Sequence, residues 1–105
     1  MVLDARFLPN PYFVPALAAD TGIDPEVARF VLDSDDAREF LERVEGLVAF
    51  LVPRAEREGK QYFTVAVGCT GGRHRSVAVV LELARRLAGQ HRVVVRHRDL
   101  SRSTT

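Results

Sequence analysis

A short apolar segment followed by two glycines constrains this chain more than any other feature. Residues 61–68, which read QYFTVAVG, are rich in β-branched and aromatic side chains and nearly continuous in apolar character. A strand of this kind is typical of a parallel sheet covered on both faces. Residues 76–88 then repeat apolar side chains at helical spacing. We therefore predict a strand, a tight loop and a helix in succession, within an α/β fold.

The remaining segments complete the predicted fold. Strands are expected over residues 2–8, where apolar and polar side chains alternate, and over residues 92–98, which read RVVVRHR. One helix is expected to begin at Pro25, and a longer one to run over residues 35–57. Pro53 falls inside the longer helix, so a kink or a break is expected there. The result is a short, mainly parallel sheet with flanking helices.

Length and composition place the chain among small globular proteins. Its 105 residues suit a single domain over residues 1–100 with a polar tail over 101–105. No apolar stretch approaches the roughly 20 residues that span a bilayer. The single cysteine cannot form an internal disulfide, which fits the reducing cytoplasm. With one Cys and three scattered His, no metal site is expected. No cofactor is expected either.

Charge is distributed unevenly along the chain. Residues 1–52 hold six more acidic than basic side chains, whereas residues 53–105 hold seven more basic than acidic ones. A basic half predicts an anionic partner. The alternative is that both halves only present solvated charged faces.

The loop Cys69–Ser76 is the candidate site. Ligands in open α/β sheets bind beyond the carboxyl ends of the strands, and the N-terminus of a helix favours anions. Gly71 and Gly72 let the backbone close around such an anion. The side chains expected to contribute donors or charge are Thr70, Arg73, His74, Arg75 and Ser76. The alternative is a tight turn with solvated arginines.

The same loop also matches the C-x5-R-[ST] signature of cysteine-dependent phosphatases, with Cys69, Arg75 and Ser76 in the catalytic positions. That chemistry needs a thiolate nucleophile, a phosphate-binding arginine and an acid for the leaving group. The candidate acids are Asp33, Asp35, Asp36 and Asp99. We favour the simpler interpretation, in which Cys69 is a small buried residue and the domain is not an enzyme.

Four segments resemble a known family when they are taken together. They occur in the order seen in the C-terminal domain of the RapZ family of bacterial RNase adapter proteins, and they read DARFLPNP (4–11), TGID (21–24), VAVGCTGGRHRSV (65–77) and RHRDL (96–100). The resemblance implies a regulatory domain that binds glucosamine-6-phosphate or a similar phosphosugar. It also implies small RNA and an RNase as partners, and self-association. In the family a nucleotide-binding domain precedes this one, so ATP or GTP binding is not carried over.

The resemblance also suggests which residues bind each partner. The phosphosugar would contact Thr70, Gly71, Gly72, His74, Arg75 and Ser76, with Arg6 and Asn10 at the rim. RNA binding in the best-known members depends on a basic tail, whereas this chain ends DLSRSTT and has Tyr12 where a histidine can follow PNP. The RNA-binding candidates that remain would contact the RNA backbone; they are Arg85, Arg86, Arg92, Arg96 and Arg98.

Overall fold

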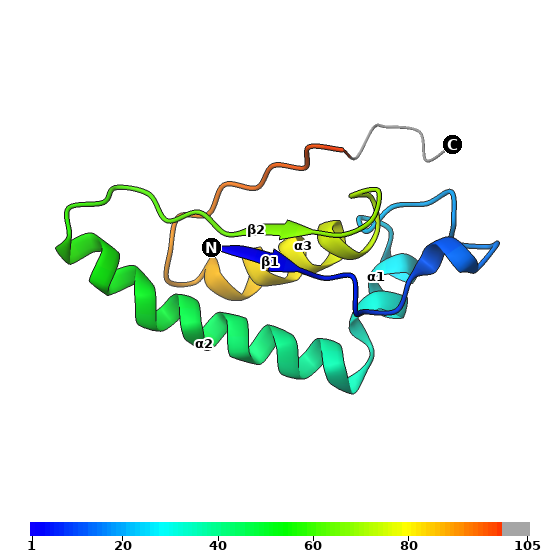
Figure 1. The fold of residues 1–105 in the computed structure, drawn as a ribbon, viewed down its shortest axis with the longest axis horizontal. Coiled ribbons are helices and arrows are strands. Elements are labelled where there is room, and N and C mark those ends of the chain that lie inside the picture. Colours follow the sequence, from blue (N-terminus) through cyan, green and yellow to red (C-terminus); the bar gives the residue numbers. More distant parts are fainter. Residues whose placement is uncertain (100–105) are drawn as a thin grey trace.

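The computed structural model describes residues 1–99 and confirms the α/β class (Figure 1). Three helices and a short 3-10 helix surround a sheet of two strands. The elements in chain order are β1 (Val2–Asp4), η1 (Pro11–Phe13), α1 (Pro25–Leu32), α2 (Asp35–Arg57), β2 (Ala66–Gly68) and α3 (Arg75–Leu87).

The two strands pair in parallel, as predicted, although they lie at opposite ends of the first two thirds of the chain. Val2 is opposite Ala66, and Asp4 is opposite Gly68. One further hydrogen bond extends the ladder, from the Ala5 N–H to the Gly68 carbonyl at 2.8 Å. Parallel strands need a long crossover connection, and here α1 and α2 lie in it. Both strands therefore end at the same edge of the sheet, where the chain turns into the glycine-rich loop.

The prediction that residues 61–68 form a strand buried on both faces is wrong in extent and in burial. Only Ala66–Gly68 pair as a strand, and Ala66 and Gly68 are exposed. The predicted strand over residues 92–98 is also wrong, since no strand is present among residues 91–99. The valines do favour extended backbone, but a ladder also needs a neighbouring strand in register. With β2 only three residues long, that neighbour is missing.

The helix starts agree with the sequence. Pro25 opens α1, and Ser34 caps α2, where its Oγ accepts the Ala37 N–H at 3.1 Å. Of the kink or break predicted at Pro53, the break does not occur, because α2 continues to Arg57. A proline in a helix leaves the carbonyl four residues earlier without its partner. Pro53 lies on the exposed side of α2, where water can satisfy that carbonyl.

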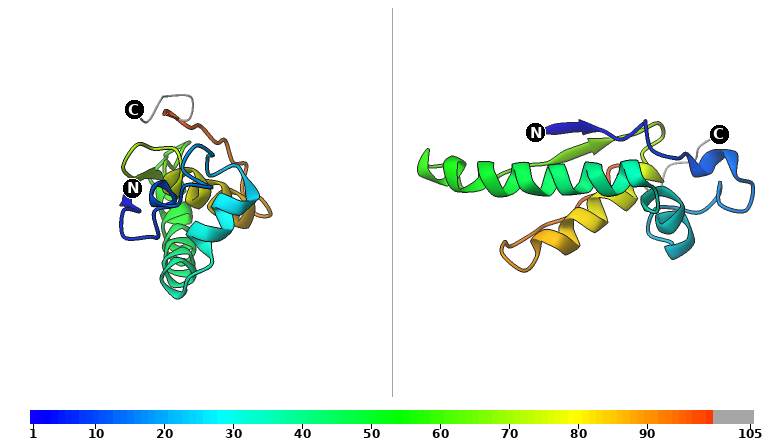
Figure 2. Two further views of the ribbon diagram at one scale, coloured as in Figure 1. Left: turned by 90° about the vertical axis from the view of Figure 1, so that its right-hand side faces the viewer. Right: turned by 90° about the horizontal axis from the view of Figure 1, so that it is seen from below.

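The core lies between the sheet and the helices. α3 crosses α2 at an angle and packs against both α2 and β2 (Figure 2). Leu41, Val44 and Val48 of α2 are buried, whereas Leu47 is exposed. Around them pack Ala5, Leu8, Leu17, Val27, Val31, Ala37, Ala78, Val79 and Leu83. No helix within residues 1–99 is long and apolar enough to cross a membrane.

Candidate anion-binding site

Residues 69–74, here called the glycine loop, connect the carboxyl end of β2 to the N-terminus of α3. Gly71 and Gly72 have φ values of +80° and +68°, in the left-handed region that glycine adopts without steric cost. The two glycines reverse the chain direction within a few residues. The loop therefore passes from the end of a parallel strand directly into the positive end of a helix dipole, a position that favours an anion.

The cysteine of the loop is hydrogen-bonded to the first turn of α3. The Ser76 N–H donates to the Sγ atom of Cys69 at 3.2 Å, and the Cys69 thiol lies 3.3 Å from the Ser76 Oγ. The sulfur thus has the kind of donor that a thiolate accepts. Cys69 is half-buried and free of any disulfide.

A shallow hollow of about 430 Å³ opens at the carboxyl end of the sheet. Three of the predicted site residues line it, namely Arg6, Cys69 and Thr70. The other predicted ligand residues are outside its lining. The rest of its wall comes from Val2, Leu3, Asp4 and Gly68. We call this feature the sheet-end hollow.

An ion pair that the sequence analysis missed occupies the sheet-end hollow. The Arg6 guanidinium donates from Nε to both carboxylate oxygens of Asp4, at 3.0 and 2.9 Å, and from a terminal nitrogen to Oδ2 at 2.6 Å. These hydrogen bonds hold the pKa of Asp4 at about 2. The hollow therefore offers a cation and a carboxylate side by side. The signal in the sequence was the D-x-R spacing that begins at the last residue of β1.

Arg75 is buried and donates to backbone carbonyls. Its side chain is 4% exposed, and one terminal nitrogen lies 2.5 Å from the Arg6 carbonyl and 3.4 Å from the Leu8 carbonyl. Its Nε atom is buried with no hydrogen-bond partner among residues 1–99. Arg75 thus ties the chain after β1 to the start of α3. Contact of Arg75 with a ligand stays a prediction.

The two basic residues of the glycine loop, Arg73 and His74, also donate to backbone carbonyls. Nε2 of the buried His74 lies 3.1 Å from the Ala18 carbonyl, and a terminal nitrogen of Arg73 lies 3.3 Å from the Ala19 carbonyl. The Gly22 N–H donates back to the Arg73 carbonyl at 2.8 Å. Arg73 and His74 therefore fasten the loop to residues 18–22. What the loop leaves for a ligand is backbone N–H groups and the Thr70 hydroxyl.

Of the four candidate acids, Asp99 is the one placed against the loop. A Cβ atom built on Gly72 would lie 3.0 Å from its Oδ2 atom. Asp33 and Asp35 instead lie near Arg38, at 3.7 and 3.5 Å, around the start of α2. Asp36 occupies the first turn of α2. Sequence spacing could not show that residues 72 and 99 would meet.

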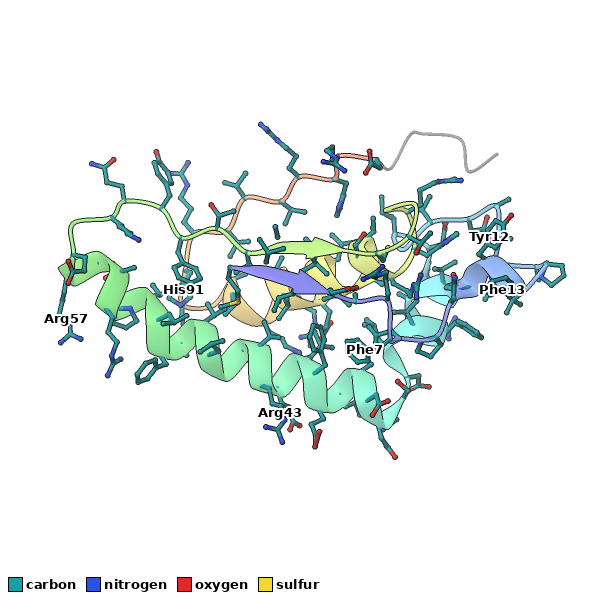
Figure 3. The ribbon with its side chains drawn as sticks, in the orientation of Figure 1. Phe7, Tyr12, Phe13, Arg43, Arg57 and His91 are labelled. Atoms are coloured by element: carbon teal, nitrogen blue, oxygen red, sulfur yellow. The ribbon has the colours of Figure 1, made fainter. Side chains whose placement is uncertain are left out.

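The rim residue Asn10 serves as a helix cap. Its Oδ1 accepts the Tyr12 N–H at 3.1 Å, which starts η1. Figure 3 places Tyr12 and Phe13 around η1, at the end of the molecule where Phe13 points away from the body. Asn10 is not part of the sheet-end hollow.

The RNA-binding candidates fall into two groups. Arg85 and Arg86 both pair with Glu82, and Arg86, which is 22% exposed, also reaches Glu45 of α2 at 3.4 Å. Hydrogen bonds from Arg85 and Arg86 hold the pKa of Glu82 at about 2. These two arginines therefore brace the helices. The three candidates on the segment after α3 are exposed; they are Arg92, Arg96 and Arg98.

No group of three or more His, Cys, Asp or Glu side chains that could hold a metal ion is present in the described part of the chain.

Comparisons with known proteins agree with the resemblance seen in the sequence. The family model of the RapZ C-terminal domain matches residues 1–101. A nucleotide-binding protein of Rubrobacter xylanophilus is 61% identical over 104 residues, which cover 94% of this chain and 34% of that relative. One of Geobacter sulfurreducens is 59% identical over 100 residues, covering 94% and 35%. The chain spans about a third of the length of these relatives. It belongs to the family of the RapZ C-terminal domain.

Proposed function

We propose that this domain is a regulatory module that binds a small phosphorylated sugar, with glucosamine-6-phosphate as the first candidate. The observation that carries the proposal is the glycine loop, in which two left-handed glycines join the carboxyl end of a parallel strand to a helix N-terminus. Backbone N–H groups in that position suit a phosphate.

The ligand would lie across the glycine loop and the sheet-end hollow. The phosphate would accept hydrogen bonds from loop N–H groups and the Thr70 hydroxyl, and Arg6 would add charge at the rim. Asp4 beside Arg6 suits a ligand that carries hydroxyl or amino donors next to its phosphate, because a carboxylate accepts such hydrogen bonds. Arg73, His74 and Arg75 would act by holding the loop in shape.

A calorimetric titration with glucosamine-6-phosphate tests the proposal. Glucosamine, inorganic phosphate and ADP serve as comparison ligands. Thr70→Val and Arg6→Met change residues of the hollow and should weaken binding of the sugar phosphate, whereas Arg43→Met changes an exposed arginine of α2 and should leave it unchanged (Figure 3). Equal binding by all three variants would refute the site.

Hydrolysis of phosphate esters by Cys69 is the second candidate function, and the hydrogen bond from the Ser76 N–H to the sulfur favours it. Arg75 already donates to two backbone carbonyls, which weighs against the phosphatase, since such enzymes use that arginine to bind the phosphate. Slow release of phosphate from p-nitrophenyl phosphate by the wild-type protein, lost in Cys69→Ser, would support the enzyme. Sugar-phosphate binding that persists in Cys69→Ser would support the sensor.

RNA binding would use the basic segment after α3. Arg92, Arg96 and Arg98 are exposed there, whereas Arg85 and Arg86 are held by Glu82. Contacts of this kind bind phosphates without reading sequence and weaken as salt rises. A mobility-shift titration at two salt concentrations, with a triple Arg→Gln variant at these positions, tests the assignment. Self-association, an RNase partner and a cytoplasmic location remain expectations from the family.

A further inference from the structure

Asp99 holds a largely buried carboxylate against the glycine loop. A Cβ atom on Gly72 would lie 3.0 Å from Oδ2 and 3.1 Å from Cβ of Asp99, so the missing side chain of Gly72 makes room for the acid. The Asp99 side chain is only 16% exposed. Burying a charged group is unfavourable unless nearby charges or donors compensate. A carboxylate buried to this degree therefore needs compensating charges or donors nearby.

Two sources of positive potential lie near this carboxylate within residues 1–99. The Arg98 guanidinium lies 3.2 Å from Oδ2, but its side chain is 86% exposed, and exposed ion pairs contribute little. The second source is the N-terminus of α3, a helix of 13 residues that begins three positions after Gly72. Asp99 thus lies where a bound oxyanion would also be favoured.

Asp99 ends a segment that is otherwise weakly attached. Residues 91–99, here called the strap, leave the C-terminal end of α3 and return to the glycine loop at the other end of that helix (Figure 1). Within the described chain, no backbone hydrogen bond fixes residues 92–98. Val93 and Val95 contribute apolar contacts in a second hollow between α2 and α3. Segments with few such attachments open at low free-energy cost.

We propose that Asp99 is an internal competitor for the anion site. Its carboxylate occupies the glycine loop in the free domain, and a phosphate-bearing ligand displaces it and releases the strap. The inference rests on the proposed function, because it assigns a means of regulation to the same loop. Two anions at one loop repel each other, so the ligand binds only the fraction of molecules in which Asp99 has moved away.

Through this displacement, binding of a small anion would control the position of a basic segment. The strap carries Arg92, Arg96 and Arg98, and with Asp99 docked it is held at the loop. Once the ligand takes the place of Asp99, the three arginines move as a free chain. Ligand binding at the loop thereby changes how the arginines of the strap are exposed to an anionic partner.

Replacement of the competing charge tests this proposal. Asp99→Asn keeps the size of the side chain and removes its charge, so its affinity for glucosamine-6-phosphate should rise about tenfold in calorimetry. Asp99→Ser should behave in the same way. Asp36→Asn changes an exposed acid of α2 and should leave the affinity unchanged.

Trypsin provides an independent measure of strap release, since it cleaves after arginine. Saturating glucosamine-6-phosphate should accelerate cleavage after Arg92 and Arg96 in the wild-type protein, with cleavage after Arg57 at the end of α2 as the internal reference. In Asp99→Asn the strap should be cleaved rapidly with or without the ligand. Equal affinities in both proteins, with strap cleavage unaffected by the ligand, would overturn the competitor and leave the proposed function standing. Binding by neither protein would overturn both.

Discussion

Gly22 and His74 are in direct backbone contact: a Cβ atom on Gly22 would lie 2.4 Å from the His74 carbonyl oxygen. The same atom would lie 2.5 Å from the backbone nitrogen of Ala78 in α3. Only a residue without a side chain lets the segment before α1 rest on the first turn of α3. This contact helps to hold the glycine loop in place, since the Gly22 N–H also bonds to the Arg73 carbonyl.

Gly22→Ala should destabilise the domain strongly. The new methyl group meets backbone atoms that cannot rotate away, and overpacking of this kind costs about 3 kcal/mol. Gly46→Ala is the matched control, because Gly46 lies on the exposed face of α2 with nothing near its Cβ position. That substitution should stabilise the helix by about 1 kcal/mol. Urea unfolding of both variants checks the pair; similar midpoints would contradict the contact.

Arg75→Met should lower the free energy of unfolding by about 2 kcal/mol or more. It removes the guanidinium that bonds the Arg6 and Leu8 carbonyls, and a buried acceptor left without its donor costs about 1–3 kcal/mol. Arg43→Met, on the surface of α2, should change stability by no more than about 0.5 kcal/mol. If chemical denaturation finds the two variants equally stable, Arg75 does not brace the chain after β1.

Alanine at Gly71 and at Gly72 should have different consequences. Both residues have positive φ, which costs an alanine about 1–2 kcal/mol. At Gly71 nothing lies near the new Cβ, whereas at Gly72 it would press on Asp99. Gly72→Ala should therefore be the more destabilising, and Asp99→Ser should recover the difference. A double-mutant cycle by thermal unfolding measures that coupling, and additive effects would argue against the Gly72–Asp99 contact.

Glu82 should make stability depend on acid pH. Hydrogen bonds from Arg85 and Arg86 lower the pKa of Glu82 from 4.5 to about 2 in the folded domain. A pKa that is lower in the folded state means that the pair stabilises fully above about pH 4.5 and loses its effect as pH falls toward 2. Glu82→Gln should thus cost about 1 kcal/mol at pH 7 and almost nothing near pH 2. A constant difference across that window would exclude this ion-pair network.

Local signals in the sequence predicted the helices and the parallel pairing well. The Ser34 cap and the proline at the start of α1 depend on neighbouring residues, so they are visible in the sequence. The buried stripe of α2 follows from helical spacing in the same way. The strand over residues 92–98 failed because β-branched composition reports backbone preference and not the presence of a partner strand.

The candidate site was harder to predict because its side chains bond to residues that are far away in the sequence. The sequence indicated that Arg73, His74 and Arg75 would offer charge to a ligand, yet each donates to a backbone carbonyl more than fifty positions away. Which carbonyls needed donors depended on the packing of residues 5–8 and 18–22. The contacts of Asp4 with Arg6 and of Asp99 with Gly72 were not predicted for the same reason, since the turns of the folded chain set both of them.

The pairing of Val2 with Ala66 also dictates the order in which this domain can be made. Closing so long a stretch of chain costs conformational entropy before the first cross-strand bond forms. While the chain emerges from the ribosome, α1 and α2 can form from local contacts, but β1 has no partner until Gly68 is out. The glycine loop is therefore completed only when α3 follows β2, and an interrupted translation product that stops in α2 would carry an unpaired, exposed first strand.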